Sequence, residues 1–437
     1  MKNNKTKPNI SYTLYHDLCL GCGICQSACP SNAIDIIINH GRFIPNVDDT
    51  KCKNDKGCHR CSDVCPGLGI DLKRIAQERF FEKNTKEDKL AGRYLKCFTG
   101  HSNDNQIRYH CASGGMVSQF LIYLLEKNYI DGAVVTAFDS QNELLVRSYI
   151  AHNRDEILQA KSSKYSPVSL HGMAQAIKQN KGTRFVIVGL PCHIQGFRKL
   201  ESIDKKFHEK IVGYFAIYCS SGRTFYLTEH VFKERGISKE KLTYLAYRDE
   251  GCLGSLVAKQ KSEITNNNSD YKKDNIYKEK YQSYYHPLRS FFIPRRCLFC
   301  IDHYGELGDI CFGDIHIKPY ISDKIGINSL IVRTKKWLDL LEEAKREGII
   351  TLDEISIMTL NTSQKMAAKK KGRNEQFILL NRLLGRITPK YDILLPKKIG
   401  VKTIFDYSQN RAQQFLGRHK SLWWLISILK KDTSHYE

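Results

Sequence analysis

The sequence predicts a small α+β domain organised by metal ligands, then an α/β domain, then a basic and mostly helical C-terminal region. Three observations favour this order. Eight cysteines lie between residues 19 and 65, strand-like and helix-period runs alternate from residue 97 to about 345, and residues 364–437 carry 16 Lys and Arg against 5 Asp and Glu. The expected boundaries are 13–72, a linker or covering segment at 73–96, 97–345 and 346–437.

The composition is that of a globular chain. Its 437 residues are 41% hydrophobic and 26% charged, which is enough for two or three cores. No apolar run approaches the roughly 18 residues of a membrane span, and the opening MKNNKTKPNI lacks the apolar stretch of a secretory signal. We therefore expect a cytoplasmic protein, in which sixteen cysteines indicate metal or redox chemistry rather than disulfides.

The first domain is organised by two cysteine runs. Four cysteines of DLCLGCGICQSACP share the spacing C-x2-C-x2-C-x3-C-P: Cys19, Cys22, Cys25 and Cys29. This is the run of bacterial ferredoxins, in which three thiolates hold one [4Fe–4S] cluster and the fourth ligates another. A second run is therefore required, and it is present as Cys52, Cys58, Cys61 and Cys65. Pro66 follows it directly.

We therefore predict a ferredoxin-like domain with two [4Fe–4S] clusters. The first cluster takes Cys19, Cys22, Cys25 and Cys65, and the second takes Cys52, Cys58, Cys61 and Cys29. The second run departs from the pattern because five residues, KNDKG, separate Cys52 from Cys58. The alternative is a pair of structural zinc sites, which usually use two C-x2-C knuckles further apart.

The second domain alternates helices and strands. GGMVSQFLIYLLEKNYI predicts a helix and DGAVVTAF a buried strand, while RFVIVGLPCHIQGFRKL predicts a strand, a turn and a helix. IVGYFAIYCSSGRTFYLTEHVFKERG repeats the last arrangement. This alternation is typical of an α/β domain with a largely parallel sheet.

Two cysteines follow strands of this sheet directly, at the edge where open α/β sheets bind ligands. Cys192 follows RFVIVGLP and Cys219 follows IVGYFAIY. Neighbouring strands lie about 4.8 Å apart, so both thiols can reach one cluster, and the pair Cys297 and Cys300 in RRCLFC can complete a set of four. The alternative is that the first two are core thiols and that the pair binds zinc or nothing.

The motifs RYHCASGGMVSQF, GLPCHIQGFRKL, YCSSG, RRCLFC and GDICFGD occur in this order. In the order and spacing of these motifs, the chain resembles the coenzyme F420 hydrogenase/dehydrogenase beta-subunit family across about residues 13 to 345. The resemblance implies an iron–sulfur flavoprotein that binds FAD and a [4Fe–4S] cluster, with a ferredoxin domain fused at the N-terminus in some members. It also maps the ligands of a third [4Fe–4S] cluster onto Cys192, Cys219, Cys297 and Cys300.

The resemblance further implies a flavin region in three stretches. Ser113, Gly114 and Gly115 open a helix, where backbone N–H groups bind phosphate; the alternative is a plain glycine turn with a serine cap. KSSKYSP contributes Ser163, Lys164 and Tyr165. The lysine can bind phosphate and the tyrosine can cover a ring; the alternative is that these are ordinary surface residues. GDICFGD contributes candidates for a loop beside the cofactor: Asp309, Gly313 and Asp314.

The implied function is an FAD- and [4Fe–4S]-dependent oxidoreductase. Its two-electron partner is expected to be the deazaflavin F420 or an unsaturated organic substrate, with polysaccharide biosynthesis as one setting; the alternative is a non-catalytic electron-relay subunit. His193 is a weak candidate for protonating a substrate and is more simply structural. The remaining cysteines receive no role: Cys97, Cys111, Cys252 and Cys311.

The C-terminal region and the net charge of +22 predict anionic partners. We expect an electron-exchanging protein such as an acidic ferredoxin and, since no recognisable motif for it occurs, no nucleic acid. The charge run KMAAKKKGRNEQF is expected to be a solvated helix face. SLWWLISIL, flanked by Lys420, Lys430 and Lys431, is expected to pack on the domain or a partner, with peripheral membrane contact as the alternative.

Overall fold

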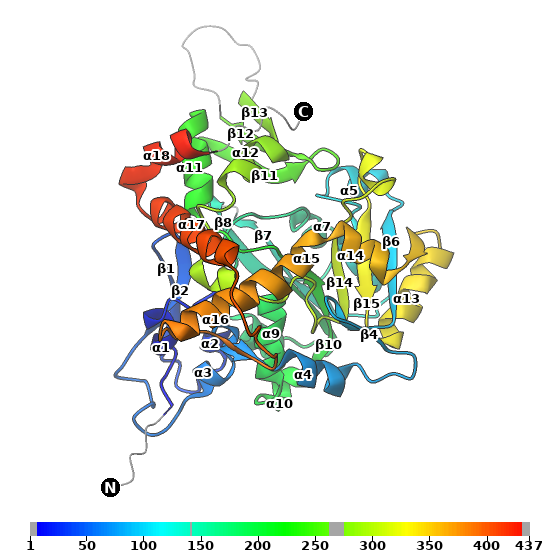
Figure 1. Cartoon of the computed structure of the whole chain (residues 1–437). Coiled ribbons are helices and arrows are strands. Elements are labelled where there is room, and N and C mark those ends of the chain that lie inside the picture. Colours follow the sequence, from blue (N-terminus) through cyan, green and yellow to red (C-terminus); the bar gives the residue numbers. More distant parts are fainter. Residues whose placement is uncertain (1–6, 140–141, 262–274, 431–437) are drawn as a thin grey trace.

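The computed structural model describes residues 7–139, 142–261 and 275–430, so most of the opening MKNNKTKPNI and Lys431 lie outside it. Figure 1 shows a central sheet with helices packed around it. The N-terminal cysteine-rich region lies beside helix α9 (Pro191–Glu201), and helix α16 (Glu375–Leu383) of the C-terminal region passes over it.

The N-terminal region is built on one antiparallel strand pair, which follows helix α1 (Ser11–Tyr15). Strand β1 (Ile34–Asn39) pairs with β2 (Arg42–Val47). Two short helices, α2 (Ile24–Ser27) and α3 (Arg60–Asp63), each contain one cysteine. Three of the five buried residues in the local core are cysteines: Ile10, Cys25, Ile34, Cys61 and Cys65. The region's own apolar core is therefore small, and other apolar residues of it, such as Leu18 and Ile24, pack in the core shared with the α/β sheet.

Within the described residues, the central sheet of the α/β domain has eight strands in the order β16-β6-β15-β14-β10-β9-β7-β8. Strands β14, β10, β9 and β7 are parallel neighbours, but the other pairings are antiparallel. The sheet is therefore mixed, and the prediction of a largely parallel sheet is correct only at its centre. Strands β8 and β15 follow β7 and β14 with no α-helix between them, and chains that return in this way pair antiparallel.

The strands of this sheet have the following bounds: β6 (Lys96–Ser102), β7 (Gly132–Asp139), β8 (Asn142–Ala151), β9 (Phe185–Gly189), β10 (Ile211–Ile217), β14 (Ile310–Asp314), β15 (Asn328–Val332) and β16 (Ile350–Ile355). The helices that connect them or flank them are α5 (Asn105–Tyr109), α6 (Met116–Glu126), α7 (Arg154–Gln159), α8 (Met173–Gln179), α10 (Lys205–His208) and α13 (Lys335–Arg346).

Side chains alternate between the two faces of the sheet. Ile187 and Tyr214 belong to the core on one face, whereas Val186 and Phe215 belong to the core on the other. The second core is closed by α6 and α13, whose Trp337 packs edge-on to Phe215. The first core combines α8 and α9 with apolar residues of the N-terminal and C-terminal regions. The three sequence regions therefore share one core instead of forming separate units.

A smaller antiparallel sheet packs at one end of the molecule (Figure 1). It consists of β11 (Leu242–Asp249), β12 (Ser255–Gln260) and β13 (Asn275–Lys280), and it shares a core with α11 (Tyr226–Arg235), α12 (Tyr281–Leu288) and α18 (Trp423–Leu429). Within SLWWLISIL, Trp423 and Ile426 are buried in this core, whereas Trp424 and Ile428 are exposed. One face of the segment thus packs on the domain, as predicted.

The segment at 73–96 packs against the domain instead of forming a free linker. It contains α4 (Leu72–Arg79), β4 (Lys86–Asp88) and β5 (Gly92–Tyr94), and Phe80 within it is completely buried.

The sheet continues beyond the predicted boundary at residue 345, because β16 pairs with β6 and extends the sheet to Ile355. Because β16 is an edge strand with solvent on one side, it carries charged residues, and these made it hard to predict as a strand. The remaining C-terminal elements are α14 (Ile357–Ser363), α15 (Lys365–Lys369), α16, β17 (Lys390–Tyr391) and α17 (Val401–Arg418), and β17 pairs with β3 (Gly69–Ile70) of the N-terminal region.

Candidate metal centres and cofactor site

The four cysteines assigned to the first cluster line one cavity: Cys19, Cys22, Cys25 and Cys65. Gly21 and Gly23 adopt φ values of 74° and 79°, in the left-handed region that favours glycine, and these turns direct the thiols of the loop inward. Burial raises the pKa of the Cys19 thiol to about 11. Thiolates are therefore unfavourable in this cavity unless a cationic metal compensates their charge.

The four cysteines assigned to the second cluster line a separate cavity: Cys29, Cys52, Cys58 and Cys61. The five-residue insertion forms a compact turn, because the backbone N–H of Cys58 donates to the Lys53 carbonyl over 3.1 Å. The Asn54 side chain closes the same turn through a 2.7 Å hydrogen bond to the Cys58 carbonyl. The longer gap therefore does not move Cys52 away from its three partners.

The strand-end cysteines of the α/β domain lie at the same edge of the sheet. Cys192 is in the first turn of α9 after β9, Cys219 follows β10, and these two strands are parallel neighbours. Burial and then negative charge on nearby thiolates, Cys219 and Cys297 among them, raise the pKa of Cys192 well above its usual value. Cys297 and Cys300 lie in and directly after a 3-10 helix at 295–299, and the Cys297 sulfur accepts a 3.3 Å hydrogen bond from the Gly222 N–H. These four thiols form the third cysteine set.

The third cysteine set lies beside the first cavity. Negative charge on Cys22 of that cavity contributes to the raised pKa of Cys192. The Cys22 carbonyl accepts a 2.9 Å hydrogen bond from the Leu170 N–H, and a side chain on Gly23 would collide with Ser169. Lys199, on the same helix as Cys192, donates to the carbonyl of Cys65 over 3.1 Å. The N-terminal region is thus docked onto the helix that carries Cys192.

The predicted solvated charge run is partly buried, and it reaches the third cysteine set. Lys370 is 1% exposed, and its Nζ lies 3.4 Å from the Cys300 sulfur and 2.7 Å from the Asp302 carbonyl oxygen. Asn374 donates to the Cys300 carbonyl over 2.8 Å. The charge pattern of the run failed to reveal this because lysines that face solvent and lysines that face buried thiols look the same in sequence.

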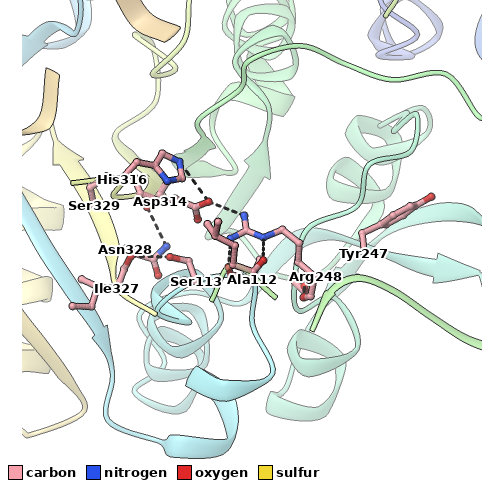
Figure 2. A network of polar contacts seen from close by, with 12 residues as sticks. Ala112, Ser113, Tyr247, Arg248, Asp314, His316, Ile327, Asn328 and Ser329 are labelled. Atoms are coloured by element: carbon pink, nitrogen blue, oxygen red, sulfur yellow. Dashed lines mark hydrogen bonds and ion pairs between the residues drawn. The ribbon is translucent and has the colours of Figure 1, made fainter. Parts of the chain in front are cut away.

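A buried arginine organises the expected flavin region, and Figure 2 shows its contacts. Arg248 of β11 donates from Nη1 to Asp314 over 2.7 Å, and its Nη2 donates to the Ala112 carbonyl. Despite burial, this guanidinium holds the pKa of Asp314 below its usual value. Arg248 thus brings together the loop before α6 and the end of β14. Sequence reasoning missed it, because no spacing or motif distinguishes it within an alternating strand.

The glycine-rich loop before α6 is held by the neighbouring strand β15. Ser113 donates to the Ile327 carbonyl over 2.8 Å (Figure 2), and Gly115 has the positive φ of 73° that begins the helix. A side chain on Gly114 would collide with the backbone N of Asn328 at 2.8 Å. Asn328 Oδ1 also accepts from the first helical N–H, that of Met116, over 3.1 Å. Packing against Asn328 restricts Gly114, and the positive φ restricts Gly115, but no serine side chain caps this end of α6.

The KSSKYSP stretch lies next to this network. Lys164 folds back, so that its Nζ donates to three carbonyls of its own loop, including that of Lys161 at 2.7 Å, and burial lowers its pKa to about 7. Ser163 beside it is half-buried. The Tyr165 ring lies 4.2 Å from the ring of Tyr285 and 5.4 Å from that of Tyr281. These three rings form the tyrosine group.

The three candidates from GDICFGD do not share one location. Asp314 lies in the Arg248 network, but Asp309 precedes β14 at its opposite end, about 17 Å away by strand geometry. There Asp309 accepts from Arg198 over 3.0 Å and from the Tyr214 N–H over 2.7 Å. The structure therefore assigns Asp309 to core packing. Gly313 is required locally, because a side chain on it would overlap the ring of Tyr218.

His193 and three of the four remaining cysteines occupy structural positions. The His193 ring nitrogen Nδ1 accepts from the Leu190 N–H at the start of α9 over 3.2 Å. The side chain is buried, which favours the structural interpretation. Cys97 and Cys311 lie in the core that the α/β sheet shares with the N-terminal region, and Cys111 lies in the core under α6.

Two features of the described residues concern metals and membranes. No three His, Cys, Asp or Glu side chains among them are arranged around a single-ion site. No helix within the same ranges has the length and apolar character to cross a bilayer.

Comparison with known families gives three matches. Residues 97–175 match the N-terminal part, and residues 182–357 the C-terminal part, of the beta chain of coenzyme F420 hydrogenase/dehydrogenase. Residues 18–69 match the 4Fe-4S dicluster domain. The last match spans all eight cysteines that line the first two cavities.

Individual relatives are distant. The chain is 24% identical over 380 residues to a coenzyme F420-dependent sulfite reductase of Methanocaldococcus jannaschii, covering 82% of this chain but only 51% of that relative. It is 26% identical over 310 residues to the coenzyme F420 hydrogenase subunit beta of Methanococcus voltae, covering 68% of this chain and 99% of that relative. A chain in a structure of the F420-reducing [NiFe] hydrogenase complex from Methanosarcina barkeri shares the fold, with a TM-score of 0.54, 18% identity, and coverage of 72% of this chain and 100% of that one.

Proposed function

Because the chain belongs to the coenzyme F420 hydrogenase/dehydrogenase beta-subunit family and carries a 4Fe-4S dicluster domain, we propose that it is an iron–sulfur flavoprotein oxidoreductase. In this proposal, a protein such as an acidic ferredoxin exchanges electrons at the N-terminal region. A small-molecule substrate reacts at the far end of the chain of cofactors. The names of the relatives favour the deazaflavin F420 as that substrate, with an unsaturated organic molecule as the alternative.

The position of the third cysteine set is the observation that carries this proposal. On one side, Cys192 lies within electrostatic reach of Cys22 in the first cavity. On the other side, Cys219 interacts with Arg223, whose Nη2 donates to the Tyr285 hydroxyl in the tyrosine group. A cluster held by the third set would therefore connect the N-terminal clusters to the expected flavin region.

The residues of the three cysteine sets suit [4Fe–4S] clusters. Each set offers four thiols in partly or fully buried positions, and thiolates are the usual ligands of such clusters. We assign the first cluster to Cys19, Cys22, Cys25 and Cys65, the second to Cys29, Cys52, Cys58 and Cys61, and the third to Cys192, Cys219, Cys297 and Cys300.

The expected flavin region also suits an anionic aromatic cofactor. The Nε of Arg223 is buried without a hydrogen-bond partner among the described residues, so it can donate to an anionic oxygen. The tyrosine group offers ring faces, and Lys164 and the start of α6 offer positive charge. Bound FAD would supply the exchange between one-electron and two-electron chemistry. The chain's own residues would orient this cofactor and exclude water from it.

Anaerobic purification followed by iron, sulfide and flavin analysis tests the proposal. We expect about twelve irons per chain, four for each cluster, and one FAD released by acid. Cys297→Ala should lose about four irons and keep the spectrum of the N-terminal clusters. Cys252→Ala, which removes a thiol outside all three sets, is the matched control and should keep every iron.

Two outcomes would contradict the proposal. Full iron content in Cys297→Ala would leave the third set as structural thiols. Absence of FAD, with added FAD failing to bind, would favour the non-catalytic electron-relay subunit instead.

A further inference from the structure

Lys370 is a buried cation whose charge no carboxylate neutralises through an ion pair in the described part of the chain. Its side chain is 1% exposed, and it donates to the carbonyl oxygen of Asp302 at 2.7 Å and to the sulfur of Cys300 at 3.4 Å. The adjacent Lys371 differs, since it pairs with Glu306 over 2.7 Å. Lys369 on the other side is exposed. The nearby Asp302 carboxylate already accepts hydrogen bonds from the Gln195 side chain and from the backbone N–H groups of Gly305 and Glu306. A buried ammonium without an ion pair is costly, so the position of Lys370 points to a further anionic group beside it.

The local backbone is specialised to deliver this lysine. Residues Lys370–Asn374 form a π-helix between α15 and α16, a rare element that is frequent at functional sites. Both ends of the π-helix contact Cys300, because Lys370 reaches its sulfur and Asn374 donates to its carbonyl over 2.8 Å. The C-terminal region thus holds the last cysteine of the third set from two directions.

A cluster held by the third cysteine set would supply the missing negative charge. The Nζ of Lys370 lies 3.4 Å from the Cys300 sulfur, within hydrogen-bond distance of one ligand of that cluster. A [4Fe–4S] cluster with four thiolates is anionic overall, and one-electron reduction makes it more so. A cation and a hydrogen-bond donor at a ligand sulfur stabilise the reduced form more than the oxidised form, which raises the reduction potential.

We propose that Lys370 is the charge partner of the third cluster, which it binds through the Cys300 sulfur, and that it raises the reduction potential of that cluster relative to a site without it. This inference rests on the proposed function, because it requires a cluster at the third cysteine set. It gives the basic C-terminal region a role at the redox centre. That role depends on a lysine which, from the sequence, looks like part of a solvated charge run.

The test is a redox titration of the anaerobically purified full-length chain, monitored by electron paramagnetic resonance. The signal of the third cluster is identified as the one that Cys297→Ala lacks. Lys370→Met removes the charge and the N–H donor but keeps an unbranched side chain. We expect its third cluster to be at least ten-fold more oxidised at a fixed potential, a shift of about 59 mV for one electron, with the N-terminal clusters unchanged.

Two further variants control for charge and for folding. Lys369→Met removes the same charge from the adjacent exposed position and should leave all three potentials unchanged. Lys370→Arg retains the cation and should keep the third cluster near its original potential. If Lys370→Met assembles only about eight irons while Lys370→Arg assembles twelve, the cation is needed to hold the cluster, which also supports the inference.

The inference is overturned if Lys370→Met retains the third cluster at an unchanged potential. It also fails if Lys369→Met shifts the potential as much as Lys370→Met does. Failure of the proposed function would look different: the unmodified chain would then contain only about eight irons, and no signal would disappear in Cys297→Ala.

Discussion

Arg296 donates from Nε to the carbonyl of Gly67 over 2.8 Å. The first residue directly precedes Cys297 of the third set, and the second follows Cys65 of the first cavity by two positions. The same guanidinium donates to the carbonyl of Pro66 over 2.9 Å. One buried side chain therefore ties the loops of two cysteine sets together.

Arg296→Met should destabilise this junction. Hydrogen bonds from a charged donor contribute roughly 1.5–3 kcal/mol each, so we expect the free energy of unfolding to fall by about 3 kcal/mol. Anaerobic urea denaturation measures this. Arg386→Met, which changes an exposed arginine, is the control and should have little effect. Equal stability of the two variants would contradict a role for Arg296 in docking the loops.

Cys52→Ala tests the cysteine that departs from the ferredoxin spacing. Because Cys52 lines the second cavity with Cys29, Cys58 and Cys61, we expect the variant to lose about four irons and keep the first cluster. Iron analysis with low-temperature spectroscopy distinguishes the two clusters. Cys311→Ala, a change at a core thiol, should keep all its iron. Complete iron content in Cys52→Ala would show that another group ligates the second cluster.

Lys164→Gln tests the proposed phosphate contact of FAD. Within the described ranges, the Lys164 ammonium donates to carbonyls of its own loop, among them that of Lys161 at 2.7 Å, so it can turn toward an anion. Loss of a charge-assisted hydrogen bond worth roughly 1.5–3 kcal/mol should weaken FAD binding about ten- to hundred-fold. Flavin fluorescence titration of the deflavinated protein measures the dissociation constant.

Burial lowers the pKa of Lys164 to about 7, so FAD affinity should fall as the pH rises through this value and the ammonium deprotonates. This pH dependence should be absent from Lys164→Gln. Lys181→Gln, a change at an exposed lysine, should bind FAD as the unmodified chain does. An equal loss of affinity in both variants would point to net charge instead of a specific contact.

His230 should make the protein less stable in mild acid. Its ring is buried between Phe292 and Trp423 of α18, and burial lowers its pKa to about 4 even though Glu234 is 3.5 Å away. The unfolded chain, with a histidine pKa of about 6.5, binds more protons between these values. The free energy of unfolding contributed by His230 is therefore present above about pH 6.5 and is lost as the pH falls toward 4.

His230→Phe removes this titration while keeping an aromatic ring in place. Between pH 7.5 and 5.5, the unmodified protein should lose about 1 kcal/mol more stability than the variant. Urea denaturation at the two pH values, compared between the two proteins, isolates the contribution of His230 from that of the other histidines. Identical pH dependence in both would show that His230 is already protonated or exposed.

Local spacing in the sequence was sufficient to predict the first two cysteine sets. Cys19, Cys22 and Cys25 lie within one short loop, so their relative positions follow from chain geometry, and the second run follows the same rule once its insertion closes as a turn. The strand-end positions of Cys192 and Cys219 were also predictable, because a strand followed by a helix identifies the carboxyl edge of a parallel sheet.

Only the tertiary structure determined which distant residues surround these sites. Arg248 and Lys370 reach their partners across more than sixty residues of sequence, from Arg248 to Asp314 and from Cys300 to Lys370. Asp309 and Asp314 show the converse, since five residues of extended strand separate them by about 17 Å. Charge and polarity in a sequence identify side chains that seek a partner. Whether that partner is water, a carboxylate or a thiolate depends on long-range packing. The free energy of burying each side chain is therefore set only by the folded structure.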